Sequence, residues 1–225
     1  MTLYRANDRL PEDETILLVK DPEEFKLFRE RGNLGIRGIV YDVAVSDTLR
    51  NSLIEFAKIV LAKYKNDPQS LSALMTKQRY DKVRFIKDTS PPTDLEIRMD
   101  VDTPQVVFEK TFKEYASPKD FKGITELYNT LALLKTCRTN AVNPDYTKQM
   151  WLKINSFYPR HYHRHEPFLT MSFNQPGTEF KNADETKSIV TPINRALIID
   201  MAVHHRASQI SDSDQKDSPR IGCML

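Results

Sequence analysis

The chain has 225 residues, 40% of them hydrophobic and 28% charged, which is typical of a globular protein with a sizeable core. Its net charge of +2 excludes a strong overall attraction to nucleic acid or acidic membranes, so such binding would need local clusters of charge. No run approaches the ~18 apolar residues of a membrane span, and the first residues lack the apolar run of a signal peptide. We therefore expect an intracellular, cytoplasmic protein without a transmembrane segment.

The cysteines and glycines argue against two further classes of protein. Cys137 and Cys223 are too few for a disulfide framework, which indicates a reducing compartment. Three of the six glycines cluster at Gly32, Gly35 and Gly38, but their spacing fits neither a dinucleotide-binding motif nor a P-loop. Nucleotide-binding enzymes of these kinds are not expected.

A small polar residue precedes proline at five points, each time before an amphipathic run. Such a residue caps a helix N-terminus, and proline supplies a helical φ where no N–H donor is needed. The pattern predicts five helix starts, at Asp21-Pro22, Asp67-Pro68, Ser117-Pro118, Asn143-Pro144 and Thr191-Pro192.

The first half of the chain reads as two buried strands and three helices. Residues 14–20 and 36–45 are short apolar runs, and the helix predicted from Pro22 between them permits a parallel pair of strands. Residues 47–65 carry apolar side chains at every third or fourth position and predict a core helix, which 68–79 follows as another.

The prolines near 88–93 indicate a subdomain boundary, after which the second half begins. Residues 94–101 alternate apolar and charged side chains and predict a half-exposed strand. Helices are expected over 118–137 and 144–157, and a strand over 168–173.

A last helix is predicted over 192–208, and the polar stretch that follows predicts a flexible tail over 209–225. The whole pattern favours an α+β fold in which five or six helices dominate four or five short strands. Residues 1–208 are expected to form a single compact domain.

Three of the five histidines alternate within the segment 158–167, which gives a first functional hypothesis. On an extended backbone His161, His163 and His165 would share one face, and two of them plus a distant ligand could hold a divalent metal. His204 could complete the site together with Asp200, because residues four apart share a face of the predicted last helix. This arrangement would suit a metal-dependent hydrolase.

Basic and aromatic residues give a second hypothesis. Lysine and arginine neutralise phosphates, and aromatic rings stack on bases of RNA or single-stranded DNA. The candidate nucleic-acid-binding residues are Lys77, Arg79, Lys82, Arg84, Lys148, Trp151, Lys153, Tyr158, Arg160, Tyr162, Arg164 and Arg206.

From the sequence we favour a non-enzymatic, self-associating structural protein of a nucleocapsid-like kind that binds RNA or a single strand. We expect homo-oligomers, a nucleic-acid partner and no cofactor. The alternatives are the hydrolase, with a divalent metal on the histidine row, and a protein-interaction scaffold without nucleic acid.

Overall fold

The computed structural model describes residues 9–31, 35–66, 83–84, 95–100, 121–142, 149–154, 167–200, 202–208 and 218–225. Strands outnumber helices in these ranges, so the prediction of a helix-dominated fold with five or six helices is wrong. The helices are η2 (Pro22–Phe25), α1 (Lys26–Arg31), α2 (Asp47–Asn66) and α5 (Ile124–Ala141). The strands are β1 (Arg9–Leu10), β2 (Asp13–Val19), β3 (Gly38–Asp42), β4 (Val83–Arg84), β5 (Leu95–Asp100), β6 (Gln149–Ile154), β7 (Phe168–Ser172), β8 (Thr178–Lys181), β9 (Ser188–Val190), β10 (Arg195–Ile199), β11 (His205–Ala207) and β12 (Ile221–Met224).

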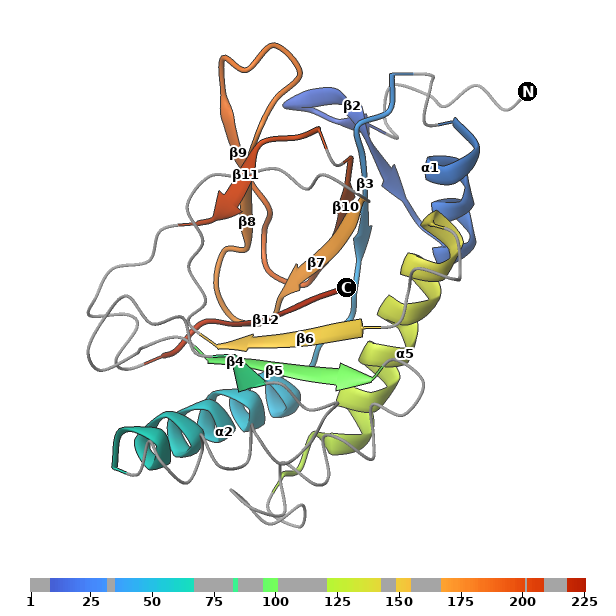
Figure 1. Cartoon of the computed structure of the whole chain (residues 1–225). Coiled ribbons are helices and arrows are strands. Elements are labelled where there is room, and N and C mark those ends of the chain that lie inside the picture. Colours follow the sequence, from blue (N-terminus) through green and yellow to red (C-terminus); the bar gives the residue numbers. More distant parts are fainter. Residues whose placement is uncertain are drawn as a thin grey trace.

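Two sheets organise the described residues. The large sheet has the order β1-β2-β3-β10-β7-β12-β6-β5-β4, and the small sheet has the order β11-β8-β9. The strands β2 and β3 pair in parallel, as their sequence order permitted, and the other described pairs are antiparallel. From β7 onward the chain passes repeatedly between the sheets, which is a jelly-roll arrangement (Figure 1).

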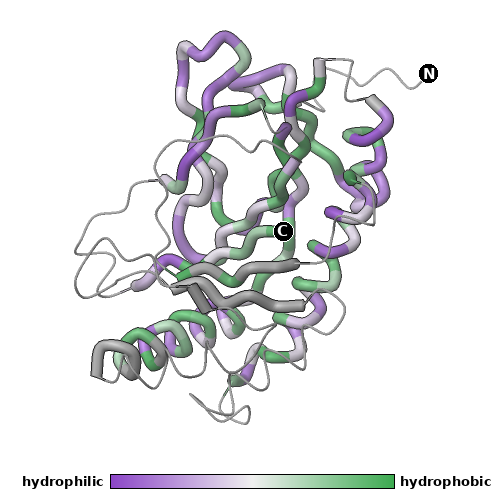
Figure 2. Tube along the Cα trace, in the orientation of Figure 1, coloured by the Kyte–Doolittle hydropathy of each residue, from purple (hydrophilic) through white to green (hydrophobic). Residues whose placement is uncertain are grey.

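Alternate side chains of the large sheet point to opposite sides. In the strands β7 and β10 the side chains on both sides are buried in a core. Leu169, Met171 and Ile198 join the core that the helices α2 and α5 cover. Phe168, Leu197 and Ile199 belong to a second core, which includes Phe180 and Ile189 of the small sheet. The large sheet is therefore the middle layer, with helices on one side and the small sheet on the other (Figures 1 and 2).

The helix α2 confirms the prediction for 47–65, and its buried side chains include Leu49, Leu53 and Phe56. A Cβ placed on Gly123 would lie 2.8 Å from the Cα atom of Leu49, so the start of α5 needs glycine to approach α2. Asp21 caps η2, as predicted, and Glu24 completes a capping box. No described helix is both long and apolar enough to span a bilayer.

The expected helix at 144–157 is replaced in its described part by β6, in which Leu152 and Ile154 are buried at a spacing of two. The expected helix at 192–208 is replaced by β10 and β11. Short apolar runs such as residues 195–199 suit a buried strand or a buried helix equally well. Here β10 lies between β3 and β7, where strand neighbours satisfy its backbone on both sides.

The end of the chain also differs from the predicted tail. The strand β12 pairs with β6 on one side and β7 on the other, which places the C-terminus inside the large sheet (Figure 1). A Cβ on Gly222 would lie 2.7 Å from the carbonyl oxygen of Met171, so this strand fits closely against β7. The helix predicted at 68–79 and the boundary at 88–93 lie outside the described residues.

Candidate functional site

The space between the two sheets contains buried polar side chains as well as the apolar core. We call this group the inter-sheet site and define it by residues of β7, β8 and β11 and by the residues that follow β11 and precede β12. Its members are Thr170, Ser172, Thr178, His205, Ser208 and Arg220, of which all but Thr170 are buried. Buried polar groups are costly unless they are hydrogen-bonded, so their concentration in one place needs an explanation.

His205 begins β11 and is only 3% exposed. It pairs in register with Phe180 of β8, and its ring lies 4.2 Å from the ring of Phe168 on β7. These contacts place the imidazole between the sheets. The Nδ1 atom lies 2.8 Å from the carbonyl oxygen of Val203, and because a carbonyl oxygen only accepts hydrogen bonds, Nδ1 is the donor.

Arg220 directly precedes β12 and is 7% exposed. Ile221 packs toward the helices, so alternation turns Arg220 toward the small sheet. The Nη1 atom donates to the carbonyl oxygen of Ser208 at 2.6 Å and contacts its hydroxyl oxygen at 3.2 Å. Ser208 in turn donates its hydroxyl to the carbonyl of Pro176 at 2.7 Å, which fixes the point where the arginine meets the small sheet.

Small hydroxyl side chains join the two sheets within the site. The hydroxyl oxygens of Thr178 on β8 and Thr170 on β7 lie 3.4 Å apart. Ser172, two residues further along β7, donates to the carbonyl of Ile221 at 3.4 Å. Ser208 is three residues after His205, which is about 10 Å of extended chain. The inter-sheet site therefore combines the imidazole of His205 with the guanidinium of Arg220, which Ser208 holds.

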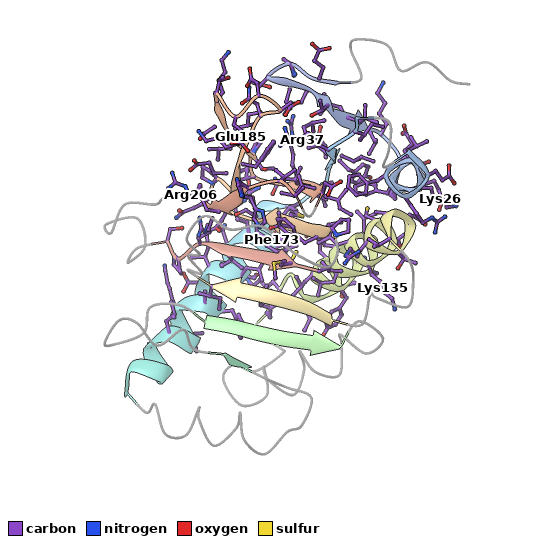
Figure 3. The ribbon with its side chains drawn as sticks, turned by 45° about the horizontal axis from the view of Figure 1, so that its top comes forward. Lys26, Arg37, Lys135, Phe173, Glu185 and Arg206 are labelled. Carbon is purple, nitrogen blue, oxygen red and sulfur yellow. The ribbon has the colours of Figure 1, made fainter. Side chains whose placement is uncertain are left out.

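The outer face of the small sheet carries charged side chains that pair with one another. Arg206 forms two hydrogen bonds to Glu179, at 2.8 and 3.0 Å, and the two residues are register partners across β11 and β8. His204 is 43% exposed at its side chain and lies 3.7 Å from a carboxylate oxygen of Glu185. Figure 3 labels Arg206 and Glu185 on this side of the molecule. Adjacent residues of one short strand thus serve opposite faces.

The residues predicted to bind nucleic acid are not brought together in the described part of the chain. Arg206 is engaged by Glu179. Trp151 and Lys153 lie in β6 and Arg84 lies in β4, where only their backbone is described. The other candidates lie outside the described residues: Lys77, Arg79, Lys82, Lys148, Tyr158, Arg160, Tyr162 and Arg164.

The residues predicted to bind a metal do not form a metal site in the described part of the chain. Asp200 and His204 do not share a helical face, because β10 ends at Ile199 and a turn follows. The row His161, His163 and His165 lies outside the described residues. Among the residues that are described, no three His, Cys, Asp or Glu side chains are grouped to hold a metal.

Both thiols are buried parts of the helix-side core. Burial raises the pKa of Cys137 and of Cys223 to about 12. A thiol reacts as its thiolate, so neither cysteine is a nucleophile near neutral pH.

The sequence interpretation missed His205 and Arg220. Within residues 202–208 the fully buried positions are Val203, His205 and Ser208, and the intervening His204 and Arg206 are more exposed, which approximates a strand pattern. Recognising that pattern would have separated His205 from His204. Arg220 lies among the apolar residues that end the chain after the polar stretch 211–218. This position indicates burial less clearly than the pattern around His205 does.

No model of a known protein family matches the chain, and no curated protein matches its sequence. Solved structures do match its fold. A full-length protein from Neurospora crassa, solved in complex with α-ketoglutarate, is 13% identical with a TM-score of 0.50, and the match covers 99% of this chain and 86% of that one. The dioxygenase for auxin oxidation 1 from Arabidopsis thaliana, solved with 2-oxoglutarate (another name for α-ketoglutarate), is 15% identical with a TM-score of 0.52, over 93% of this chain and 90% of that one.

This likeness establishes the fold and corrects the functional expectations drawn from the sequence. The chain folds like a dioxygenase and like a second protein that binds the same small dicarboxylate. The expectation of a non-enzymatic, self-associating RNA-binding protein with a nucleic-acid partner and no cofactor is therefore wrong. The hydrolase and scaffold alternatives gain no support either.

Proposed function

We propose that the chain is an oxygenase that uses iron(II) and 2-oxoglutarate in the inter-sheet site. The observation that carries this proposal is the pairing of a buried, oriented His205 with a buried Arg220 inside the fold that the two neighbours share. An imidazole suits a metal ion, and a guanidinium suits a carboxylate.

His205 fits the part of a metal ligand. Histidine ligands commonly donate one ring N–H to a backbone carbonyl, which fixes the ring and makes the other nitrogen more basic. The contact from Nδ1 of His205 to Val203 has this form. The ring of Phe168, whose centroid lies 4.2 Å from that of His205, packs against the same imidazole.

The remaining ligands are proposed, from the sequence alone, to come from residues 161–166, which lie outside the described part of the chain. Iron(II) oxygenases of this type use two histidines and one carboxylate. The same segment contains His161, His163, His165 and Glu166 and so offers both kinds of donor.

Arg220 is proposed to bind the distal carboxylate of 2-oxoglutarate. The guanidinium is held by Ser208, so its direction is set before a ligand arrives. Thr170, Ser172 and Thr178 lie on the facing strands and offer hydroxyl groups to the rest of a polar dicarboxylate.

When bound, iron(II) and 2-oxoglutarate supply oxygen activation, in which O2 oxidises 2-oxoglutarate to succinate and CO2 and gives its second oxygen atom to a substrate C–H bond. The chain contributes binding and orientation through His205 and Arg220. Phe168, Phe180 and Leu197 surround the site with apolar surface, which excludes water and strengthens the electrostatic interactions inside it.

The test is succinate formation. Purified protein would be loaded anaerobically with iron(II), mixed with 2-oxoglutarate and exposed to O2, with His205→Ala as the paired variant. The proposal expects succinate from the wild type and at least about 100-fold less from the variant. Equal succinate from both proteins, or none from a wild type that retains iron, would overturn it.

A further inference from the structure

A pocket of about 330 Å³ opens at the seam between the two sheets. Leu18 and Val40, from β2 and β3, form its large-sheet wall, and Phe180 and Ile189, from β8 and β9, form its small-sheet wall. This volume suits a small molecule, and pockets of this kind bind ligands mainly through apolar surface.

The pocket adjoins the inter-sheet site. Phe180, which lines the pocket, is the register partner of His205. Phe180 therefore lies beside both the pocket and His205.

One apolar side chain of the pocket is unusually exposed. Val190, at the end of β9, lines the pocket and is 41% exposed. Among the described residues, the other large hydrophobic side chains exposed to a similar degree are Ile59 and Ile193, and neither of them lines the pocket. Val190 therefore extends the apolar lining of the pocket to the surface.

The charges at the rim favour one sign of ligand. Arg195 lines the pocket, but its Nε atom donates to Asp42 at 2.7 Å, so a carboxylate offsets its charge. Glu12, in the turn between β1 and β2, also lines the pocket and is exposed. The ion pairs found among the described residues do not include Glu12. Among the described residues that line the pocket, Glu12 is therefore the charge that none of these ion pairs offsets.

We propose that this pocket binds the substrate that is hydroxylated and that this substrate is a small apolar amine. Its hydrocarbon body would lie against Phe180, and its ammonium group would point toward Glu12. The inference rests on the proposed oxygenase function for the oxidation itself, which inserts one oxygen atom of O2 into a C–H bond of the amine as described above. The binding preference depends only on the pocket.

The test uses three probes with the same aromatic body: 2-phenylethylamine, 2-phenylethanol and 3-phenylpropionate. Each would be titrated into the protein without metal or 2-oxoglutarate, and binding followed by chemical-shift changes in nuclear magnetic resonance spectra. We expect the amine to bind about fivefold more tightly than the carboxylate, as a partly solvated ion pair allows. Glu12→Gln should remove this preference, and Val190→Ser should weaken the binding of all three probes.

Glu14→Gln is the matched control, because it removes the same charge two residues away at an exposed position that does not line the pocket. Equal affinities for the amine and the carboxylate, no binding of any probe, or the same loss of preference in Glu14→Gln would overturn the inference. Amine binding in a protein that forms no succinate would uphold the pocket assignment and overturn the proposed function. Succinate formation without amine binding would uphold the proposed function and overturn the pocket assignment.

Discussion

His204 and His205 are neighbours in sequence but occupy opposite environments. His204 is half-exposed beside Glu185, whereas His205 is buried between the sheets against Phe168. Because a strand sends adjacent side chains to opposite faces, only one of the pair can reach the inter-sheet site. The same rule separates Arg206, on the outer face, from the polar side chains inside.

The two histidines should differ in their effect on iron(II) binding. His205→Ala should weaken iron(II) binding by more than about 100-fold because it removes a proposed ligand. His204→Ala should leave the affinity within about twofold, since His204 faces away from the site. Calorimetric titration of the metal into each variant measures both effects. An equal loss in the two variants would show that His205 has no special part in metal binding.

Arg220 should govern the affinity for 2-oxoglutarate. Arg220→Gln removes a charge-assisted hydrogen bond of about 1.5–3 kcal/mol, so Kd should rise at least tenfold. Arg220→Lys, which keeps the charge but loses the planar fork, should fall between the wild type and the glutamine variant. Metal affinity, measured alongside, should stay constant. A glutamine variant that binds 2-oxoglutarate as the wild type does would remove Arg220 from the site.

Burial of the two thiols should make the stability of the protein depend on pH in the alkaline range. An exposed cysteine is largely thiolate at pH 9, whereas the pKa of Cys137 and of Cys223 is raised to about 12 by burial. The folded form keeps both protons where the unfolded chain loses them, so this contribution to stability is full below about pH 8.5 and decreases as the pH rises toward 12. Iodoacetamide at pH 9 should therefore label neither thiol until denaturant unfolds the protein. Rapid labelling of the native protein would contradict their burial.

At the scale of elements, the small sheet depends on a pair between its strands. Glu179 on β8 is held by Arg206 on β11 in a two-point contact, and Glu179 is 7% exposed. This pair fixes the position of β11 and therefore of His205, which precedes Arg206. Arg206 thus has a structural part in place of the predicted contact with phosphate.

We expect a coupling free energy of about 1–2 kcal/mol between Glu179 and Arg206. The double-mutant cycle would use Glu179→Gln and Arg206→Met, with the free energy of unfolding measured in urea. Lys58→Met and Glu55→Gln provide a control cycle for an exposed pair, which should couple by less than about 0.5 kcal/mol. Equal coupling in both cycles would show that burial adds nothing to the Glu179 pair.

The elements that could be predicted from sequence are those with local signals. The capped helix that starts at Pro22, the long stripe of α2 and the alternation in β5 each depend on neighbours in sequence. The strands β6, β10 and β12 were missed because their stability comes from pairing with distant strands. A central strand buried on both faces loses the alternation that would identify it.

At the scale of the whole molecule, the large sheet joins segments from Arg9 to Met224 in one hydrogen-bonded array. The array includes the end of the chain, which was expected to be a tail, and the single domain expected over residues 1–208 stays a prediction. The inter-sheet site combines residues of β7 and β8 with residues at β11 and next to β12, which come later in the chain. The histidine row led the sequence analysis to consider a metal site, whereas the metal ligand that we propose from the structure is His205. The sequence did not reveal His205 because it showed neither the strand β11 nor the sheet that faces it.

We propose that a metal ion and 2-oxoglutarate bind together between the sheets. Isothermal titration of 2-oxoglutarate into the wild-type protein under argon, with and without iron(II), measures whether the two depend on each other. We expect saturable binding of a single 2-oxoglutarate per chain that is at least tenfold tighter when iron(II) is present. Absence of binding to the iron-loaded protein, or binding that ignores the metal, would contradict it.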